Sequence, residues 1–320
     1  MKQHQNLKGS LILGLASLIW GMAFVAQSDA ATKVPPFLVN GTRSLIGALA
    51  LFLLLLFQCK KSHQPLFPKD PDARRQTLIG GLVCGVLITV SCNLQQFGLS
   101  IYPDGVASEA RAGFLTAMYV ILVPVISLFM GKKLRLPLIC AILISASGIY
   151  LLCLSGGLDA IYLGDVLIFL CAISFAFHIL AIDRYVGAAG GVRLSMLQFL
   201  VCGVLSSLLS FCFEPTQIVW KDLLSAMPQL LYLGIGSTGI AYTLQIVGQK
   251  YAEPTVASLT MSLESVFAAL GGWLISGNTL TLRELGGCAL VFVAIVLAQL
   301  PEKKNANFPT KKKTDSSPIP

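Results

Sequence analysis

The chain has 320 residues, of which 55% are hydrophobic and only 12% are charged, and its formal net charge is +8 at neutral pH. A soluble domain has about 25% charged residues and cannot hide this much apolar surface, whereas a lipid bilayer can solvate it. The basic residues flank apolar segments and form no patch interleaved with stacking aromatic side chains, which excludes nucleic acid as a partner. The expected partner is the bilayer.

Ten apolar runs of membrane-spanning length follow one another along the chain, since about 20 apolar residues cross the hydrocarbon core. They cover residues 9–28, 36–57, 77–99, 106–130, 136–155, 164–183, 194–213, 228–249, 255–276 and 282–300. Pro124, inside the fourth run, predicts a kink, and Gly81-x-x-x-Gly85 in the third predicts a close helix–helix approach. The fold class is therefore an all-α polytopic membrane protein with ten transmembrane helices.

Lysine and arginine are distributed unequally between the two sides of these runs. With the N-terminus in the cytoplasm, 18 of them fall on the cytoplasmic side and 3 on the outer side, while Arg43 and Arg111 fall within runs. This bias predicts a multi-pass protein of the inner (plasma) membrane with both termini in the cytoplasm. Residues 1–8 then form a cytoplasmic N-terminus, and residues 301–320 form a basic, disordered cytoplasmic tail rich in lysine, serine and proline.

The two halves of the chain share a sequence pattern. The motif Leu94-Gln95-x-x-Gly98 recurs 150 positions later as Leu244-Gln245-x-x-Gly248, and the Val-Ala-Ser that follows each motif after seven residues recurs with it. Residues 9–155 and 164–300 thus form two repeats of five runs each. Because five is odd, the second repeat must be inverted relative to the first. Secondary transporters commonly have this plan, with the site near the midplane between the halves.

Short motifs also follow one another in a fixed order along the chain: Ile19-Trp20-Gly21, Arg43, Gly113-Phe114-Leu115, Val123-Pro124, Gly164-Asp165, Ala241-Tyr242 with Gln245, Leu263-Glu264 and Gly286-Gly287. In this order and spacing they resemble the drug/metabolite transporter superfamily, specifically its EamA-type family of ten-span permeases, over residues 9–299. One departure is Ser265, which follows Glu264 where the family commonly has proline. The resemblance implies metabolite transport, often export, without fixing a substrate.

Two ionisable residues inside the runs are candidates for function, because charged groups in a membrane are costly. Glu264, near the middle of the ninth run, is a candidate proton carrier or ligand of a cationic group; otherwise it is a buried carboxyl that hydrogen-bonds to a neighbouring helix. Arg43 is a candidate to bind a substrate carboxylate with two parallel hydrogen bonds. Its alternative role is that of a structural arginine that snorkels or caps backbone carbonyls.

Four further residues are candidates that carry no charge of their own at neutral pH. Gln95 and Gln245 occupy equivalent positions in the two repeats, and each either contacts substrate or joins helices by hydrogen bonds. Trp20 is too deep for an interfacial aromatic belt, so it either lines a cavity or fills space between helices. His178 is a candidate proton relay, and its alternative is a packing role.

Cofactor chemistry is not indicated by any spacing in the chain. The nine cysteines lie mostly within the apolar runs and show no Cys-x-x-Cys or Cys/His spacing, so we expect no metal, no disulfide framework and no cofactor. No G-x-x-x-x-G-K-[ST] loop for ATP occurs either. The energy for transport would therefore come from solute exchange or an ion gradient.

Three classes of function were weighed against these features. The leading hypothesis is alternating-access transport of a small organic solute, such as an amino acid or a drug-like molecule, with export favoured over uptake. A lipid or lipid-carrier flippase on the same scaffold is the alternative, and a laterally open cleft would favour it. An intramembrane enzyme is disfavoured because the runs contain no paired aspartates, Ser/His dyad or H-E-x-x-H motif. The oligomeric state stays open, a homodimer included.

The charge bias generates a topology that reporter fusions can test. Fusions placed after Lys61 and after Lys133 should be active only with a cytoplasmic reporter, and fusions near Asp159 only with an external one, because basic loops are retained in the cytoplasm. Paired phosphatase and fluorescent-protein fusions measure this directly. A C-terminal fusion that reports an external location would contradict the inverted five-plus-five arrangement.

Overall fold

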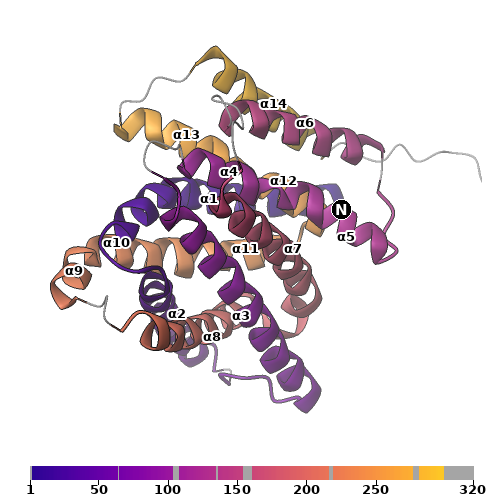
Figure 1. Cartoon of the computed structure of the whole chain (residues 1–320). Coiled ribbons are helices and arrows are strands. Elements are labelled where there is room, and N and C mark those ends of the chain that lie inside the picture. Colours follow the sequence, from indigo (N-terminus) through magenta and orange to yellow (C-terminus); the bar gives the residue numbers. More distant parts are fainter. Residues whose placement is uncertain are drawn as a thin grey trace, which may run out of the picture.

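The computed structural model of the chain describes residues 2–63, 65–103, 108–134, 136–153, 161–215, 219–276 and 281–298. Regular structure in these ranges is entirely helical (Figure 1). The elements are α1 (Lys2–Ala31), α2 (Pro36–Ser62), α3 (Pro71–Ser100), α4 (Ser108–Ala117), α5 (Tyr119–Phe129), α6 (Leu136–Cys153), α7 (Leu163–Ala189), α8 (Gly191–Phe213), α9 (Trp220–Ser225), α10 (Met227–Leu231), η1 (Tyr232–Ala241), α11 (Tyr242–Gln249), α12 (Pro254–Met261), α13 (Leu263–Ser276) and α14 (Leu282–Ala298). The predicted tail, 301–320, lies outside the described residues.

Seven helical segments among the described residues are long and apolar enough to cross a membrane: Leu7–Ala31, Pro36–Ser62, Pro71–Ser100, Ala112–Phe129, Leu163–Ala189, Gly191–Phe213 and Met227–Gln249. Two further helical segments, Leu136–Leu151 and Pro254–Leu270, are also apolar but shorter. The remaining predicted run, 282–300, contains the 17-residue helix α14. The all-helical, multi-pass membrane class predicted from composition is therefore confirmed.

Two helical segments are interrupted near their middle. In the fourth predicted run the break between α4 and α5 lies at Met118, six residues before Pro124, which sits inside α5. In the ninth run the break between α12 and α13 lies at Ser262. The backbone stays hydrogen-bonded at both breaks, but the spacing shortens to three residues where Met118 N–H donates to the Leu115 carbonyl and Ser265 N–H to the Ser262 carbonyl, both at 3.2 Å. A short stretch of this tighter geometry inside a helix often marks a hinge.

Most helices of the first half of the chain pack against a helix of the second half, and the same contacts recur with the two halves exchanged. Extensive contacts join α2 to α8 and α6 to α14, and α3 packs against α7 while α1 packs against η1 and α11. In the same way α1 lies against α12 and α13, while α7 lies against α4 and α5. The pair α6 and α14 forms one edge of the bundle, opposite the group of α2, α3 and α8 (Figure 1).

Glycines in α3 allow α8 to approach closely, as the Gly-x-x-x-Gly spacing predicts. A Cβ atom at Gly81 would lie 2.6 Å from the Cβ atom of Leu197, and one at Gly85 would lie 2.5 Å from that of Val201. Both distances are shorter than real carbon–carbon contacts. The two helices therefore fit together only because these positions lack side chains.

The segment η1 is a π-helix of ten residues. π-Helices are rare and usually limited to a single turn, frequently at functional sites. At Gly234 in this segment a Cβ atom would lie 2.6 Å from Ile46 Cγ2 in α2. The π-helix therefore contacts α2 closely at a position without a side chain. The segment leads directly into α11, which carries Tyr242 and Gln245.

The glycine packing generates a stability test. We expect Gly85→Ala to destabilise the protein by about 1–3 kcal/mol, because the added methyl group overpacks the α3–α8 interface. The matched control is Gly14→Ala in α1, where no atom lies within 4 Å of the added Cβ and the change favours the helix by up to about 1 kcal/mol. Thermal unfolding of the two purified variants checks this, and equal unfolding midpoints would contradict the close approach.

Candidate functional site

A partly enclosed cavity of about 50 Å³ lies among helices from both halves of the chain. It is lined by Trp20, Phe24, Gln27, Arg43, Gln95, Thr116, Tyr119, Phe175, Ile179, Ser237, Tyr242, Gln245, Met261 and Glu264. Of the six candidate residues from the sequence, the structure brings five together here and places His178 elsewhere. Small-molecule sites have this character, with mainly apolar walls and a few polar groups.

Arg43 reaches the cavity from α2, whose first turn is held by the carboxylate of Glu214, the residue directly after α8. The backbone N–H groups of Phe37 and Leu38 donate to the two oxygens of Glu214, at 2.9 and 3.0 Å, and a helix N-terminus favours such a negative group. Arg43 itself is 4% exposed. Its Nη1 donates to Gln27 Oε1 at 3.1 Å.

The guanidinium of Arg43 has no carboxylate partner among the described residues, whose ion pairs are Lys33–Asp29 and Lys132–Asp183. A buried charge that is not paired is costly, and within a membrane it has little access to water. One neutral amide does not offset this cost. An anionic group in the cavity would offset this cost.

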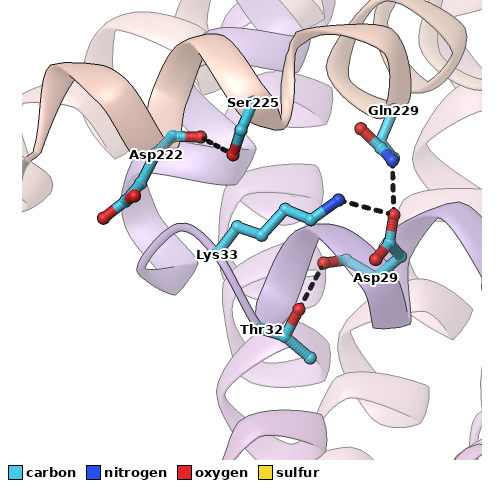
Figure 2. A network of polar contacts seen from close by, with 6 residues as sticks. All are labelled: Asp29, Thr32, Lys33, Asp222, Ser225 and Gln229. Atoms are coloured by element: carbon cyan, nitrogen blue, oxygen red, sulfur yellow. Dashed lines mark hydrogen bonds and ion pairs between the residues drawn. The ribbon is translucent and has the colours of Figure 1, made fainter.

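A polar network lies at the adjacent end of α1 (Figure 2). The Asp29 carboxylate accepts hydrogen bonds from Lys33 Nζ, at 2.9 Å, and from the side-chain amide of Gln229 in α10. Thr32 Oγ1 donates to the Asp29 backbone carbonyl at 2.8 Å. These contacts join the end of α1 to α10, two residues beyond Gln27 in the chain.

Glu264 lies just after the break at Ser262, as the second residue of α13. It is 7% exposed, and Tyr119, the first residue of α5 after the break at Met118, donates its hydroxyl to Glu264 Oε1 at 2.8 Å. One hydrogen bond thus links the two interrupted segments at the cavity wall. Glu264, like Arg43, has a neutral partner and no ion pair among the described residues.

The two repeat-related glutamines both line the cavity but differ in their contacts. Gln95 Nε2 donates to Thr116 Oγ1 at 3.1 Å. Gln245 Oε1, by contrast, is buried and has no hydrogen-bond partner. A buried amide oxygen without a partner is costly, so Gln245 presents an acceptor that a bound molecule can use.

Aromatic rings form much of the remaining wall. Trp20 and Tyr242 meet edge to face with ring centroids 4.7 Å apart, and Tyr242 meets Phe199 in the same way at 4.9 Å. The indole Nε1 of Trp20 is buried without a hydrogen-bond partner. Of the two roles expected for Trp20, the structure places it at a cavity wall.

His178 does not line the cavity. Its ring is fully buried, its Nε2 lies 2.9 Å from Gln198 Oε1 and its centroid is 6.4 Å from that of Tyr242. This placement is that of a residue packed behind the cavity wall. Within the described part of the chain, no group of three or more His, Cys, Asp or Glu side chains is placed to hold a metal ion.

Sequence reasoning missed five polar residues of the cavity: Gln27, Thr116, Tyr119, Ser237 and Tyr242. Each is uncharged, and the search for candidates was directed mainly at ionisable residues. The available signal was that all five lie within predicted spans, where a buried hydrogen-bonding side chain requires a partner. That signal marks candidates, but only the packing shows which of them meet.

The chain is similar to known transporters. The model of the EamA-like transporter family matches the chain twice, over residues 7–154 and 162–300. An uncharacterized transporter of Archaeoglobus fulgidus is 27% identical over 92% of this chain and 87% of its own length. The uncharacterized inner membrane transporter YedA of Escherichia coli is 25% identical over 88% of each chain.

A solved crystal structure is also similar. It superposes with a TM-score of 0.70 at 22% sequence identity, and the match covers 91% of this chain and 96% of that protein. At this identity the likeness shows the fold alone.

Proposed function

We propose, since this chain belongs to the EamA-like transporter family, that it is a secondary transporter that carries a small organic solute across the cytoplasmic membrane. This proposal rests on the cavity. The buried side chain of Arg43 lines it and has no anionic partner among the described residues. Export is the proposed direction. Both termini are placed in the cytoplasm on the basis of the lysine and arginine bias.

The proposed mechanism is alternating access by two inverted halves of five spans each, ten spans in total. The double match of the family model, over 7–154 and 162–300, supports the division into halves. The contacts support the inversion: α2 meets α8 and α6 meets α14, so each contacts its own counterpart, while α1 meets α12 and α13 as α7 meets α4 and α5. A two-fold axis in the membrane plane would produce such reciprocal pairs.

The two interrupted segments are the proposed moving parts of the site. Discontinuous helices at the midplane commonly form transporter binding sites. Here Thr116 and Tyr119 flank the break at Met118, and Met261 and Glu264 flank the break at Ser262, and all four of these flanking residues line the cavity. A shift of one segment relative to the other would change the cavity and the Tyr119–Glu264 contact together.

The function is tested by an untargeted comparison of the solutes released by cells that express the protein and by cells that lack it. We expect at least one organic anion or zwitterion to be exported only with the wild type. Arg43→Ala should abolish this export while the protein stays in the membrane, and Arg43→Lys should not restore it, because an ammonium group cannot reproduce the planar, two-pronged contact.

The matched control is Arg184→Ala, which removes an exposed arginine of α7. It should leave export at the wild-type level. Identical solute profiles with and without the protein would refute the transport function, and normal export by Arg43→Ala would reduce Arg43 to a structural role.

Glu264 is the proposed coupling residue, because it lines the cavity whereas His178, the other proton-carrier candidate, does not. A group whose proton affinity differs between two conformations links them to a proton gradient. Glu264→Gln permanently imitates the protonated form, so we expect it to lose the response of flux to an imposed pH gradient in proteoliposomes. Glu253→Gln, at an exposed position, is the control. An equal response of wild type and Glu264→Gln would exclude the coupling role.

A further inference from the structure

The cavity is too small, in the conformation described, for the solute that the proposed function requires. Its volume is about 50 Å³, whereas pockets for drug-sized molecules usually have about 300–1,000 Å³. One wall must therefore move before an organic solute can enter. The wall formed by η1 and α11 contributes Ser237, Tyr242 and Gln245, and its helical geometry differs from that of its counterpart in the other half of the chain.

The counterpart of η1 in the first half is an ordinary α-helix. The motifs Leu94-Gln95 and Leu244-Gln245 lie 150 positions apart, so η1, at 232–241, corresponds to residues 82–91 within α3. The π-helical spacing reaches the end of η1, where the Tyr242 N–H donates to the Ser237 carbonyl five residues earlier. The polar side chains that follow the two segments differ accordingly.

Thr243, two residues after η1, has a buried hydroxyl without a hydrogen-bond partner. In an α-helix a threonine hydroxyl often donates to the carbonyl four residues earlier, as Thr89 and Thr260 do at 2.6 and 2.8 Å. Asn93, the counterpart of Thr243, makes the equivalent bond to the Thr89 carbonyl at 2.8 Å. The corresponding acceptor for Thr243 is the Gly239 carbonyl, which lies in η1. In the π-helical spacing the two groups do not bond.

Gln245 differs from its counterpart in the same direction. Gln95 Nε2 donates to Thr116 Oγ1 at 3.1 Å, whereas Gln245 Oε1 is buried without a partner. At both positions the first half of the chain is hydrogen-bonded and the second half is not. A buried polar atom without a partner is costly, so a conformation that satisfies Thr243 and Gln245 together gains two hydrogen bonds.

Ser262 is the residue that would complete this pattern for Gln245. The motif Gly131-x-x-Leu134-x-Leu136 recurs 146 positions later as Gly277-x-x-Leu280-x-Leu282, and Thr116 and Ser262 each lie 15 residues before the glycine. Ser262 lies at the break between α12 and α13, and its hydroxyl donates to the Leu259 carbonyl at 2.7 Å. A hydroxyl rotates and both donates and accepts, so Ser262 can bond the Gln245 amide.

We propose, resting on the transport function above, that η1 is a register switch that opens the cavity. In the opposite access state it becomes α-helical, as its counterpart in α3 already is. The Gly239 carbonyl then accepts from the Thr243 hydroxyl, and the Gln245 amide bonds Ser262. The second half of the chain thereby adopts the hydrogen bonds that the first half already has.

The conversion moves the wall that closes the cavity. Because π- and α-helices differ in residues per turn, it rotates α11 relative to α10. Tyr242 is thereby separated from Trp20, and the ring centroids of these two residues are 4.7 Å apart in the closed cavity. Glycines make the segment easy to convert. At Gly236 and Gly239 an added Cβ atom would have no contact shorter than 3.4 Å, so packing does not require glycine there, and glycine holds any single helical form weakly.

Disulfide trapping in the full-length protein, in membranes, tests the new contact. Gln245→Cys combined with Ser262→Cys should form a disulfide on oxidation with copper phenanthroline. Mass spectrometry of the linked peptides distinguishes this bond from any that involves a native cysteine. Gln249→Cys combined with Ser262→Cys is the control and should not link, because a displacement of one helical turn, about 5.4 Å, exceeds what disulfide geometry tolerates.

Thr243→Val tests whether η1 controls this contact. The substitution keeps the branched shape of the side chain, and Thr243 is not among the residues that line the cavity. We expect a higher thermal unfolding midpoint, because a buried hydroxyl without a partner is removed. We also expect the disulfide between positions 245 and 262 to form about three- to tenfold more slowly, because the α-helical state loses the bond to Gly239. Thr89→Val is the control: it removes a bonded hydroxyl of α3, so it should lower the midpoint and leave the disulfide rate unchanged.

Three results would overturn the proposal. The first is a folded double-cysteine protein that forms no disulfide between the two positions. The second is a Thr243→Val variant whose unfolding midpoint falls or stays unchanged. The third is a disulfide rate that Thr243→Val does not change. All three readouts are structural, so the solute comparison between expressing and non-expressing cells still decides the transport function independently.

Discussion

The cost of a buried charge in a membrane is the constraint on which the rest of this site depends. Arg43 lies in a segment that the bilayer surrounds, and it has one neutral hydrogen-bond partner where a guanidinium has five donors to satisfy. Burial of such a group is tolerated when the surrounding structure holds it against a cavity that a ligand or water can enter. The Glu214 carboxylate anchors the first turn of α2, the helix that carries Arg43. The Asp29 network joins the end of α1, the helix that carries Gln27, to α10.

The two halves of the chain have similar sequence but differ in local structure. Gln95 is satisfied by Thr116, whereas Gln245, its counterpart in the sequence repeat, has an amide oxygen without a partner. The segment before Gln245 is the π-helix η1, whereas the segment before Gln95 belongs to the continuous α-helix α3. A π-helix has more residues per turn than an α-helix, so it changes the direction in which Tyr242 and Gln245 project. The same motif thus presents to the cavity a hydrogen-bonded amide from the first half of the chain and an amide oxygen without a partner from the second.

Close packing and the breaks in the helices have complementary roles. Where Gly81 and Gly85 bring α3 against α8, the helices are continuous and their contact leaves no room for side chains. Around the cavity, by contrast, α4 and α5 are separated at Met118 and α12 and α13 at Ser262. The continuous helices therefore form a tightly packed group beside the site, and the change of helical hydrogen-bond spacing falls at the cavity, where a bend is more easily accommodated than within a continuous helix.

The sequence by itself determined the all-helical membrane class, the family and the position of nearly every helix, because these depend on local hydrophobicity and on short motifs that the chain carries in order. It also identified Trp20, Arg43, Gln95, Gln245 and Glu264, since polar and aromatic residues in apolar runs stand out without any knowledge of neighbours. Only the tertiary structure decided that these five share one cavity while His178 packs behind its wall, that Gln27 partners Arg43, and that Tyr119 partners Glu264. Those pairings join residues 16 and 145 positions apart, and contacts at such separations follow from how the helices pack, which hydrophobicity along the chain does not encode.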